Sequence, residues 1–205
     1  MRSLQSSAVR EMAMVVGVRK SFFPRGTVKS EGAVSFRSQT ARDVACLMDV
    51  DGSVHSWTCN PPALLVSDKS FVCDFSVVDI WGVESLVDAP DHETDIADGD
   101  LRAAATKAGF EYARRTRSEV YSGCRLRNAK DLLRYSNYQV PLGDRVRLLA
   151  ALEEHGSLTV VECLTAFSET KPIGGLASMI LAGFVEVDLD DALIGPGTQV
   201  KRITA

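Results

Sequence analysis

Two apolar runs, each with a carboxylate near one end, constrain the fold of this chain more than any other part of its sequence. The first covers residues 71–79 and contains Asp74, and the second covers residues 85–90 and contains Asp88. Gly82 stands between the two runs and permits a tight turn. We therefore expect two neighbouring strands of one sheet, with both carboxylates close together near the sheet edge.

Helix and strand patterns surround these two runs. Residues 38–48 carry apolar side chains at the spacing of an amphipathic helix, and Ser38 is suited to cap its start. Apolar segments bounded by turn residues predict strands at 54–57, 63–66, 71–78 and 86–87. Further along, the pattern predicts a helix at 101–108, a strand at 110–113 and a helix at 128–135.

The pattern changes after residue 142. Three short helices are predicted at 144–154, 157–167 and 172–182, followed by strands at 184–189 and 199–203. Three short helices and a β-hairpin, in this order, are typical of a winged helix. We therefore expect an α/β fold in two parts, a mixed-sheet core flanked by helices at 1–142 and a small winged-helix-like domain at 143–205.

Charged residues are unevenly distributed along the chain. The 205 residues contain 23 Lys and Arg against 27 Asp and Glu, a net charge of −4. Residues 1–42 and 101–148 are basic, whereas 43–100 and 149–205 are acidic. A chain that is acidic overall has to contact DNA through local basic surfaces. The candidates for DNA-binding phosphate contacts are Arg114, Arg115, Arg117, Arg125, Arg127 and Lys130.

Two interpretations of this basic cluster stay open. The cluster is either a DNA-binding surface or a solvated face. The helix predicted at 172–182 contains no Lys or Arg. Because a helix that contacts bases and phosphates needs such residues, this helix favours protein contact or core packing over reading of the major groove.

Hydropathy and cysteine usage indicate a cytoplasmic protein with no membrane partner. No segment approaches the roughly 18–20 apolar residues that span a bilayer, and the first 20 residues lack the pattern of a secretory signal. The five cysteines are odd in number and scattered, as expected for reduced thiols. The sequence does not support a zinc site, because it has no CxxC pair and its three histidines stand alone.

Several short segments, taken in order, resemble the TnsA family, the PD-(D/E)xK endonucleases that cut 5′ ends in heteromeric transposons. The resemblance runs from about Arg25 to the end of the chain, and the order and spacing of the segments carry it. The segments are 25–30, 38–43, 47–54, Asn60-Pro61, Cys73-Asp74-Phe75, 87–90, 108–112 and 126–133. The resemblance implies a restriction-endonuclease-like core, followed by a small domain that is the usual docking surface of the family.

The resemblance also locates four departures from the catalytic motif. Ala41 stands where the family has a helix glutamate, Cys73 where it has proline, Asp88 where it has glutamate and Pro90 where it has lysine. The catalytic and Mg²⁺-binding positions that remain are Asp74 and Asp88. Phosphodiester hydrolysis of this kind needs carboxylates to hold Mg²⁺ and a cation to stabilise charge. Loss of one such group typically slows an enzyme by about 10²–10³-fold.

These departures lead us to expect a DNA-associated TnsA-like protein with impaired cleavage. The resemblance implies a companion transposase and an AAA+ regulatory ATPase as partners in transposition. Two alternatives stay open: an active but divergent Mg²⁺-dependent DNA endonuclease, and a winged-helix transcription regulator. In the simplest structural interpretation, Asp74 and Asp88 are polar residues at strand ends without a catalytic role.

Overall fold

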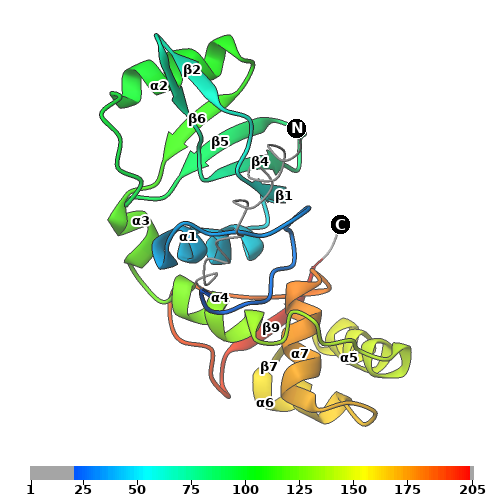
Figure 1. The fold of residues 1–205 in the computed structure, drawn as a ribbon. Coiled ribbons are helices and arrows are strands. Elements are labelled where there is room, and N and C mark those ends of the chain that lie inside the picture. The colour runs from blue at the N-terminus through cyan, green and yellow to red at the C-terminus, as the bar shows by residue number, and fades with distance from the viewer. Residues whose placement is uncertain (1–20, 204–205) are drawn as a thin grey trace, which may run out of the picture.

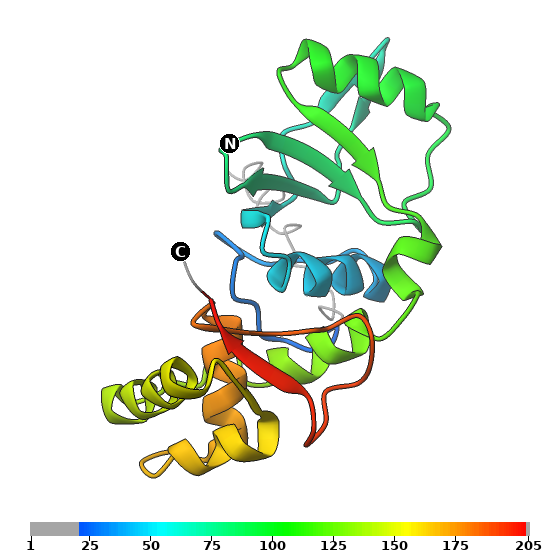
Figure 2. The same cartoon turned by 180° about the vertical axis from the view of Figure 1, so that it is seen from behind.

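The computed structural model describes residues 21–203 and shows a mixed α/β protein (Figures 1 and 2). The expectation of no secretory signal rests on residues 1–20, which lie outside this range, as do four of the basic residues in segment 1–42. Within residues 21–203, no helix combines the length and the apolar character that a membrane crossing requires.

The larger sheet contains the two predicted carboxylate strands as neighbours. Its strands, in spatial order, are β1 (Val54–Cys59), β4 (Phe75–Asp79), β5 (Glu84–Asp88) and β6 (Glu111–Arg114). The first three form an antiparallel meander, and β6 joins β5 in parallel. Gly82 adopts a φ of 82° in the β4–β5 turn, and Asp79 Oδ1 accepts the N–H of Val83 at 2.8 Å. The expected hairpin is confirmed.

Two helices cover opposite faces of this sheet (Figure 1). Helix α1 (Gln39–Asp49) packs its apolar stripe against Trp57, Phe75 and Val87. Helix α2 (Asp98–Lys107) packs on the other face through Leu101 and Ala105, against side chains that include Leu86 and Tyr112. Since side chains alternate along a strand, Asp88 lies on the same face as Leu86, toward α2.

The predicted strand at 71–78 is wrong in its first half. A separate hairpin forms from β2 (Leu64–Val66) and β3 (Lys69–Phe71), with Leu64 paired to Phe71. The chain then leaves the extended pairing over residues 72–74 before β4 begins. The register of Phe75 with Val87 places Asp74 beside Asp88, just beyond the last pair of the β4–β5 ladder.

Two buried charges of α1 hold the chain that precedes it. The guanidinium of Arg42 is 0% exposed and donates to the carbonyls of Pro24 and Gly26, at 2.8 and 2.6 Å. Asp49 accepts the backbone N–H of Lys29 at 3.1 Å and the indole N–H of Trp57 at 3.0 Å. Burial raises the pKa of Asp49 against the effect of these donors. The segment before α1 is thereby fixed along the helix.

The C-terminal part has its own small sheet. In chain order its elements are α5 (Leu142–His155), β7 (Ser157–Thr159), α6 (Val160–Cys163), the 3₁₀ helix η1 (Leu164–Ala166), α7 (Pro172–Leu181), β8 (Val185–Val187) and β9 (Gln199–Arg202). The sheet order is β7-β9-β8, all antiparallel. The predicted helix at 157–167 is wrong at its start, because Gly156 ends α5 at φ 74° and Thr159 caps a new helix.

Helices α3 (Arg117–Tyr121) and α4 (Arg125–Leu133) connect the two parts. The sequence predicted one helix at 128–135; the structure starts it earlier and adds α3. Helix α4 packs against α1 and, through Leu132, against Ala177 of α7 and Leu189 after β8. Buried Asn128 donates to the carbonyls of Leu189 and Ala192, both at 2.8 Å, and accepts the N–H of Ile194 at 3.0 Å.

Substituting Asn128 by alanine should therefore destabilise the junction. Asn128→Ala leaves three backbone groups without their partner, and we expect the free energy of unfolding to fall by about 2–4 kcal/mol in urea denaturation. The matched control is Asn137→Ala, since Asn137 is exposed, and its effect should stay within about 0.5 kcal/mol. Equal effects of the two substitutions would contradict the role given to Asn128.

Candidate functional site

The structure brings Asp74 and Asp88 together, as the sequence predicts. Asp74 lies just before β4 and Asp88 ends β5, and the backbone N–H of Asp74 donates to Asp88 Oδ1 at 2.8 Å. The sequence analysis missed a third residue, His92. Its Nδ1 lies 2.7 Å from Asp88 Oδ1 and 3.5 Å from Asp74 Oδ2. These three side chains offer ligand atoms that all lie within 4.8 Å of one another.

A turn centred on Pro90 brings His92 to this site. The N–H of His92 donates to the carbonyl of Ala89 at 3.0 Å, which closes a four-residue turn with Pro90 at its second position. Proline favours that position because its ring fixes φ. Pro90 therefore has a conformational role here, and it directs the chain so that the imidazole returns to Asp88.

Asp88 is the most enclosed carboxylate of the site. Its side chain is 0% exposed, and Oδ2 accepts the hydroxyl of Tyr112 at 2.9 Å. Tyr112 reaches it because β6 pairs with β5 in register Leu86 to Tyr112, on the face toward α2. Burial, followed by the neighbouring charge of Asp88, raises the pKa of Tyr112 well above its ordinary value. The hydroxyl is therefore a hydrogen-bond donor at neutral pH.

Asp74 is paired with an arginine that the sequence analysis also missed. The guanidinium of Arg37 binds it through two contacts, Nε to Oδ1 at 3.2 Å and Nη2 to Oδ2 at 3.1 Å. Nη2 also lies 2.9 Å from Asp91 Oδ1. Burial on its own lowers the pKa of Arg37, but the hydrogen bonds from Asp74 and Asp91 outweigh it and the pKa is raised. The side chain of Asp74 is only 6% exposed.

The other motif positions offer no replacement for the missing groups. Ala41 is buried in the apolar cluster between α1 and the sheet. Asp43, the nearest carboxylate on α1, binds Lys130 at 2.7 Å and the amide of Gln39 at 2.6 Å. In residues 21–203, Asp74 forms an ion pair with Arg37, both carboxylates contact the imidazole of His92, and neither pairs with a lysine.

The arrangement does not fit a magnesium ion. The four carboxylate oxygens of Asp74 and Asp88 already accept six hydrogen bonds, from Arg37, His92, Tyr112 and two backbone N–H groups. Mg²⁺ needs free oxygen ligands in near-octahedral geometry and keeps several waters. The positive guanidinium in front of Asp74 also repels a cation. In this structure the site links β4, β5 and β6 through the hydrogen bonds to Asp88.

The six basic residues predicted to bind DNA do not form one open cluster. Four of them have acidic partners: Arg114 binds Asp98, Arg115 binds Glu119, Arg125 binds Asp190 and Lys130 binds Asp43. Arg117 and Arg127 are exposed, and in the described part of the chain neither takes part in an ion pair. Their guanidinium groups are the ones left for phosphate contacts.

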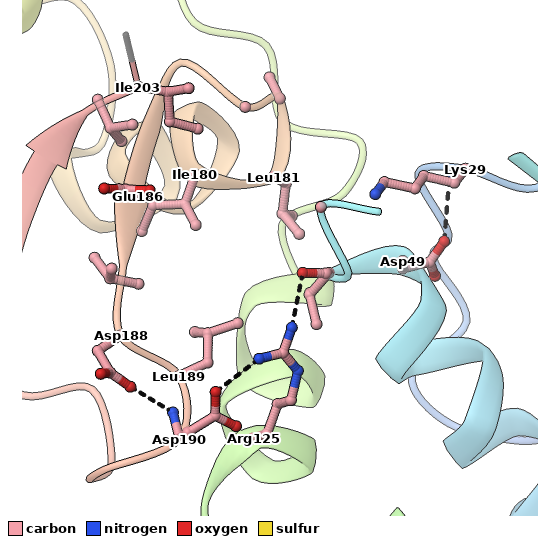
Figure 3. Close-up of a pocket in the computed structure, with 16 residues that line it drawn as sticks. Lys29, Asp49, Arg125, Ile180, Leu181, Glu186, Asp188, Leu189, Asp190 and Ile203 are labelled. Carbon is pink, nitrogen blue, oxygen red and sulfur yellow. Dashed lines mark hydrogen bonds and ion pairs between the residues drawn. The ribbon is translucent and has the colours of Figure 1, made fainter. Parts of the chain in front are cut away.

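A second concave region, which the sequence did not indicate, lies between the two parts of the chain (Figure 3). This groove has a volume of about 490 Å³ and lies between the C-terminal end of α1 and the segment around β8. Its two cations are already used: Arg125 binds Asp190 at 2.8 Å, and Lys29 Nζ binds the carbonyl of Val54 at 2.8 Å. The groove gathers no set of groups suited to catalysis.

Helix α7, the third main helix of the C-terminal part, is packed on two sides. The ring of Tyr138 lies against Gly174, where an added Cβ would come within 3.0 Å, and Phe167 lies against Gly175. Ala177 contacts the core helix α4 through the cluster it shares with Leu132. This packing, together with the absence of basic residues in α7, leaves the helix unsuited to entering a DNA groove.

Comparison with known proteins adds no assignment. The sequence matches no protein-family model, and no curated protein is detectably similar to it. The site is therefore interpreted from its own geometry.

The hydroxyl of Tyr112 should contribute measurably to stability. Tyr112→Phe leaves one oxygen of the buried Asp88 carboxylate without its donor, and we expect a loss of about 1.5–3 kcal/mol in the free energy of unfolding. The control is Tyr121→Phe, because the Tyr121 hydroxyl reaches Thr40 at only 3.4 Å on the surface. Chemical denaturation of both variants at pH 7 tests this. An equal loss in the two would contradict the contact to Asp88.

The thiol of Cys73, next to the site, should resist alkylation in the folded protein. Burial, followed by the charges of Asp88 and Asp74, raises the pKa of Cys73 to about 12, so about one thiol in 10⁴ is ionised at pH 8. We expect iodoacetamide to modify the partly exposed Cys124 first, as followed by mass spectrometry of peptides. Denaturation should remove the difference. Equal native rates would contradict the enclosed environment of Cys73.

Proposed function

We propose that this protein is a catalytically impaired TnsA-like endonuclease subunit, which acts in DNA binding and in assembly of a transposition or mobile-element complex. One observation carries the proposal. The carboxylates at the nuclease positions, Asp74 and Asp88, are hydrogen-bonded by Arg37, His92 and Tyr112, while the lysine position is Pro90. Such a site lacks the free carboxylate oxygens and the lysine ammonium that hydrolysis requires.

The connectivity of the core supports the nuclease-like part of the proposal. The core consists of a helix, three antiparallel strands, a crossover helix and a parallel strand, in the order α1, β1, β4, β5, α2 and β6, with the separate β2–β3 hairpin inserted after β1. A restriction-endonuclease-like mixed sheet flanked by helices has this arrangement. Asp74 and Asp88 lie at one end of β4 and β5, where such a fold places its acidic residues. The family assignment itself rests on the sequence resemblance.

The C-terminal part supports a role in protein assembly. Its elements have the order of a winged helix, with the hairpin β8–β9 after α7. Because α7 is packed against α4 and carries no basic residue, we infer that this part contacts protein and does not read bases. The TnsA resemblance suggests a companion transposase and an AAA+ ATPase as the partners.

A second candidate function is a divergent metal-dependent endonuclease. The observation in its favour is the approach of Asp74, Asp88 and His92 within 4.8 Å. Metal binding there would need the guanidinium of Arg37 to leave Asp74. No comparable observation favours a transcription regulator, since α7 packs against α4 and carries no Lys or Arg.

A plasmid-nicking assay separates the two candidates. We expect no nicking of supercoiled DNA by the full chain with Mg²⁺ or Mn²⁺ above the level of Asp74→Ala, because the site holds no free cation-binding oxygens. The Asp74→Ala variant controls for contaminating nucleases. Cleavage by the wild-type chain that this substitution abolishes would establish the second candidate and refute the impaired-enzyme proposal.

DNA association should depend on the two unpaired arginines. We expect the full chain to bind duplex DNA with a salt-dependent affinity, and Arg117→Ala with Arg127→Ala to reduce the slope of log affinity against log salt by about 2. The control is Arg102→Ala, which removes an equally exposed arginine from α2, at the far end of the molecule from α4 (Figure 1). An unchanged slope in the double variant would show that Arg117 and Arg127 do not contact DNA.

A further inference from the structure

We infer that the guanidinium of Arg37 takes the place of a divalent metal ion beside Asp74 and Asp88. Its positive charge and its two contacts with Asp74 prevent metal ions from binding there. The inference rests on the proposed function and deepens it. It also predicts what the site becomes without the arginine: a site formed by Asp74, Asp88 and His92 that accepts transition-metal ions in preference to Mg²⁺.

The first support is the charge balance of the site. Asp74 and Asp88 are 6% and 0% exposed, and buried carboxylates need a cation or several donors nearby. Arg37 supplies a full positive charge through a two-pronged contact with Asp74. The guanidinium is planar and presents its donors in a fork, so it satisfies both oxygens of Asp74 at once.

The second support is the position of Arg37 outside the packed core. Arg37 directly precedes Ser38, the N-cap of α1, and its side chain is 37% exposed. Its partners are Asp74 and the turn residue Asp91, which it holds through the Asp91 carboxylate and carbonyl at 2.9 and 3.0 Å. The side chain thus reaches the site from the surface, and replacing it removes charge without opening the apolar core.

The third support is the spacing of the groups behind Arg37. Metal bonds to carboxylate oxygen and imidazole nitrogen are about 2.0–2.2 Å long, so neighbouring ligands of one ion lie about 3–3.5 Å apart. His92 Nδ1 lies 2.7 and 3.5 Å from oxygens of Asp88 and Asp74. The imidazole is also stacked on the ring of Phe71, with centroids 4.9 Å apart, which fixes its plane.

The donor set decides the class of metal. Mg²⁺ prefers oxygen ligands alone, whereas imidazole suits Fe²⁺, Ni²⁺ and Zn²⁺; Mn²⁺ binds most weakly of the first-row divalent ions, so it is the most stringent probe among them. His92 at the site therefore favours the transition metals. In the wild-type chain the guanidinium and the ion would compete for the same oxygens of Asp74, and the arginine is covalently held at high effective concentration.

Mn²⁺ titration followed by the electron paramagnetic resonance signal of the free ion tests the inference on the full, chelator-treated chain. We expect no saturable binding by the wild-type chain up to about 1 mM. Arg37→Gln should bind one Mn²⁺ at least about 10-fold more tightly than wild type, and its melting temperature should rise with Mn²⁺ by mass action. Mg²⁺ should compete weakly with Mn²⁺.

Two further variants keep the test specific. Adding His92→Ala to Arg37→Gln should abolish the gained binding, whereas Arg37→Lys retains a cation and should stay close to wild type. Should Arg37→Gln not fold, Asp91→Asn loosens the second anchor of Arg37, and we expect a severalfold gain in Mn²⁺ affinity.

The results that would overturn this inference differ from the results that test cleavage of DNA. Wild-type binding of Mn²⁺ as tight as that of Arg37→Gln, or no gain in either Arg37→Gln or Asp91→Asn, would overturn the inference. Preference for Mg²⁺ over Mn²⁺ would overturn the role of His92. Plasmid nicking by the wild-type chain would refute the proposed function, whereas the comparison of metal affinities between variants concerns Arg37 alone.

Discussion

The buried carboxylate of Asp88 is the constraint on which the site and the core depend. A charge with no exposure is tolerated only when its oxygens are hydrogen-bonded, and Asp88 receives donors from three separate segments. The Asp74 N–H connects Asp88 to the start of β4, the Tyr112 hydroxyl connects it to β6, and the His92 imidazole connects it to the turn after β5. These bonds link the three strands, and beside them the Arg37 guanidinium is the charged group that occupies the oxygens of Asp74.

Pairing of opposite charges in the fold also explains the uneven charge along the sequence. Basic residues of segment 101–148 pair with acidic residues of the two neighbouring segments: Arg114 with Asp98, Lys130 with Asp43 and Arg125 with Asp190. An exposed pair such as Arg125 with Asp190 contributes little to stability, about 0–1 kcal/mol. Such pairs do reduce the positive potential of the surface. A basic segment in a sequence is therefore a weak indicator of a DNA-binding face unless its partners are known.

The parts of the fold that the sequence predicts are those with a repeating pattern. The β4–β5 hairpin follows from its apolar runs and Gly82, and the stripe of α1 follows from its period. Strand β7 has three residues, too few for a period to show. Arg37 and His92 lie outside regular elements, and their approach to Asp74 and Asp88 depends on tertiary contacts that local spacing does not encode.

The turn at Pro90 and the presence of Arg37 are physically coupled. A site that keeps two enclosed carboxylates without metal or lysine would hold like charges close together, at a cost of several kcal/mol. Pro90 forms the turn that returns His92 to Asp88 and presents Asp91 to Arg37. The turn therefore supplies one partner of Asp88 and an anchor for the arginine that binds Asp74. Placing lysine at position 90 alone would disturb this turn while leaving Arg37 on Asp74, so a single substitution there does not free the carboxylates.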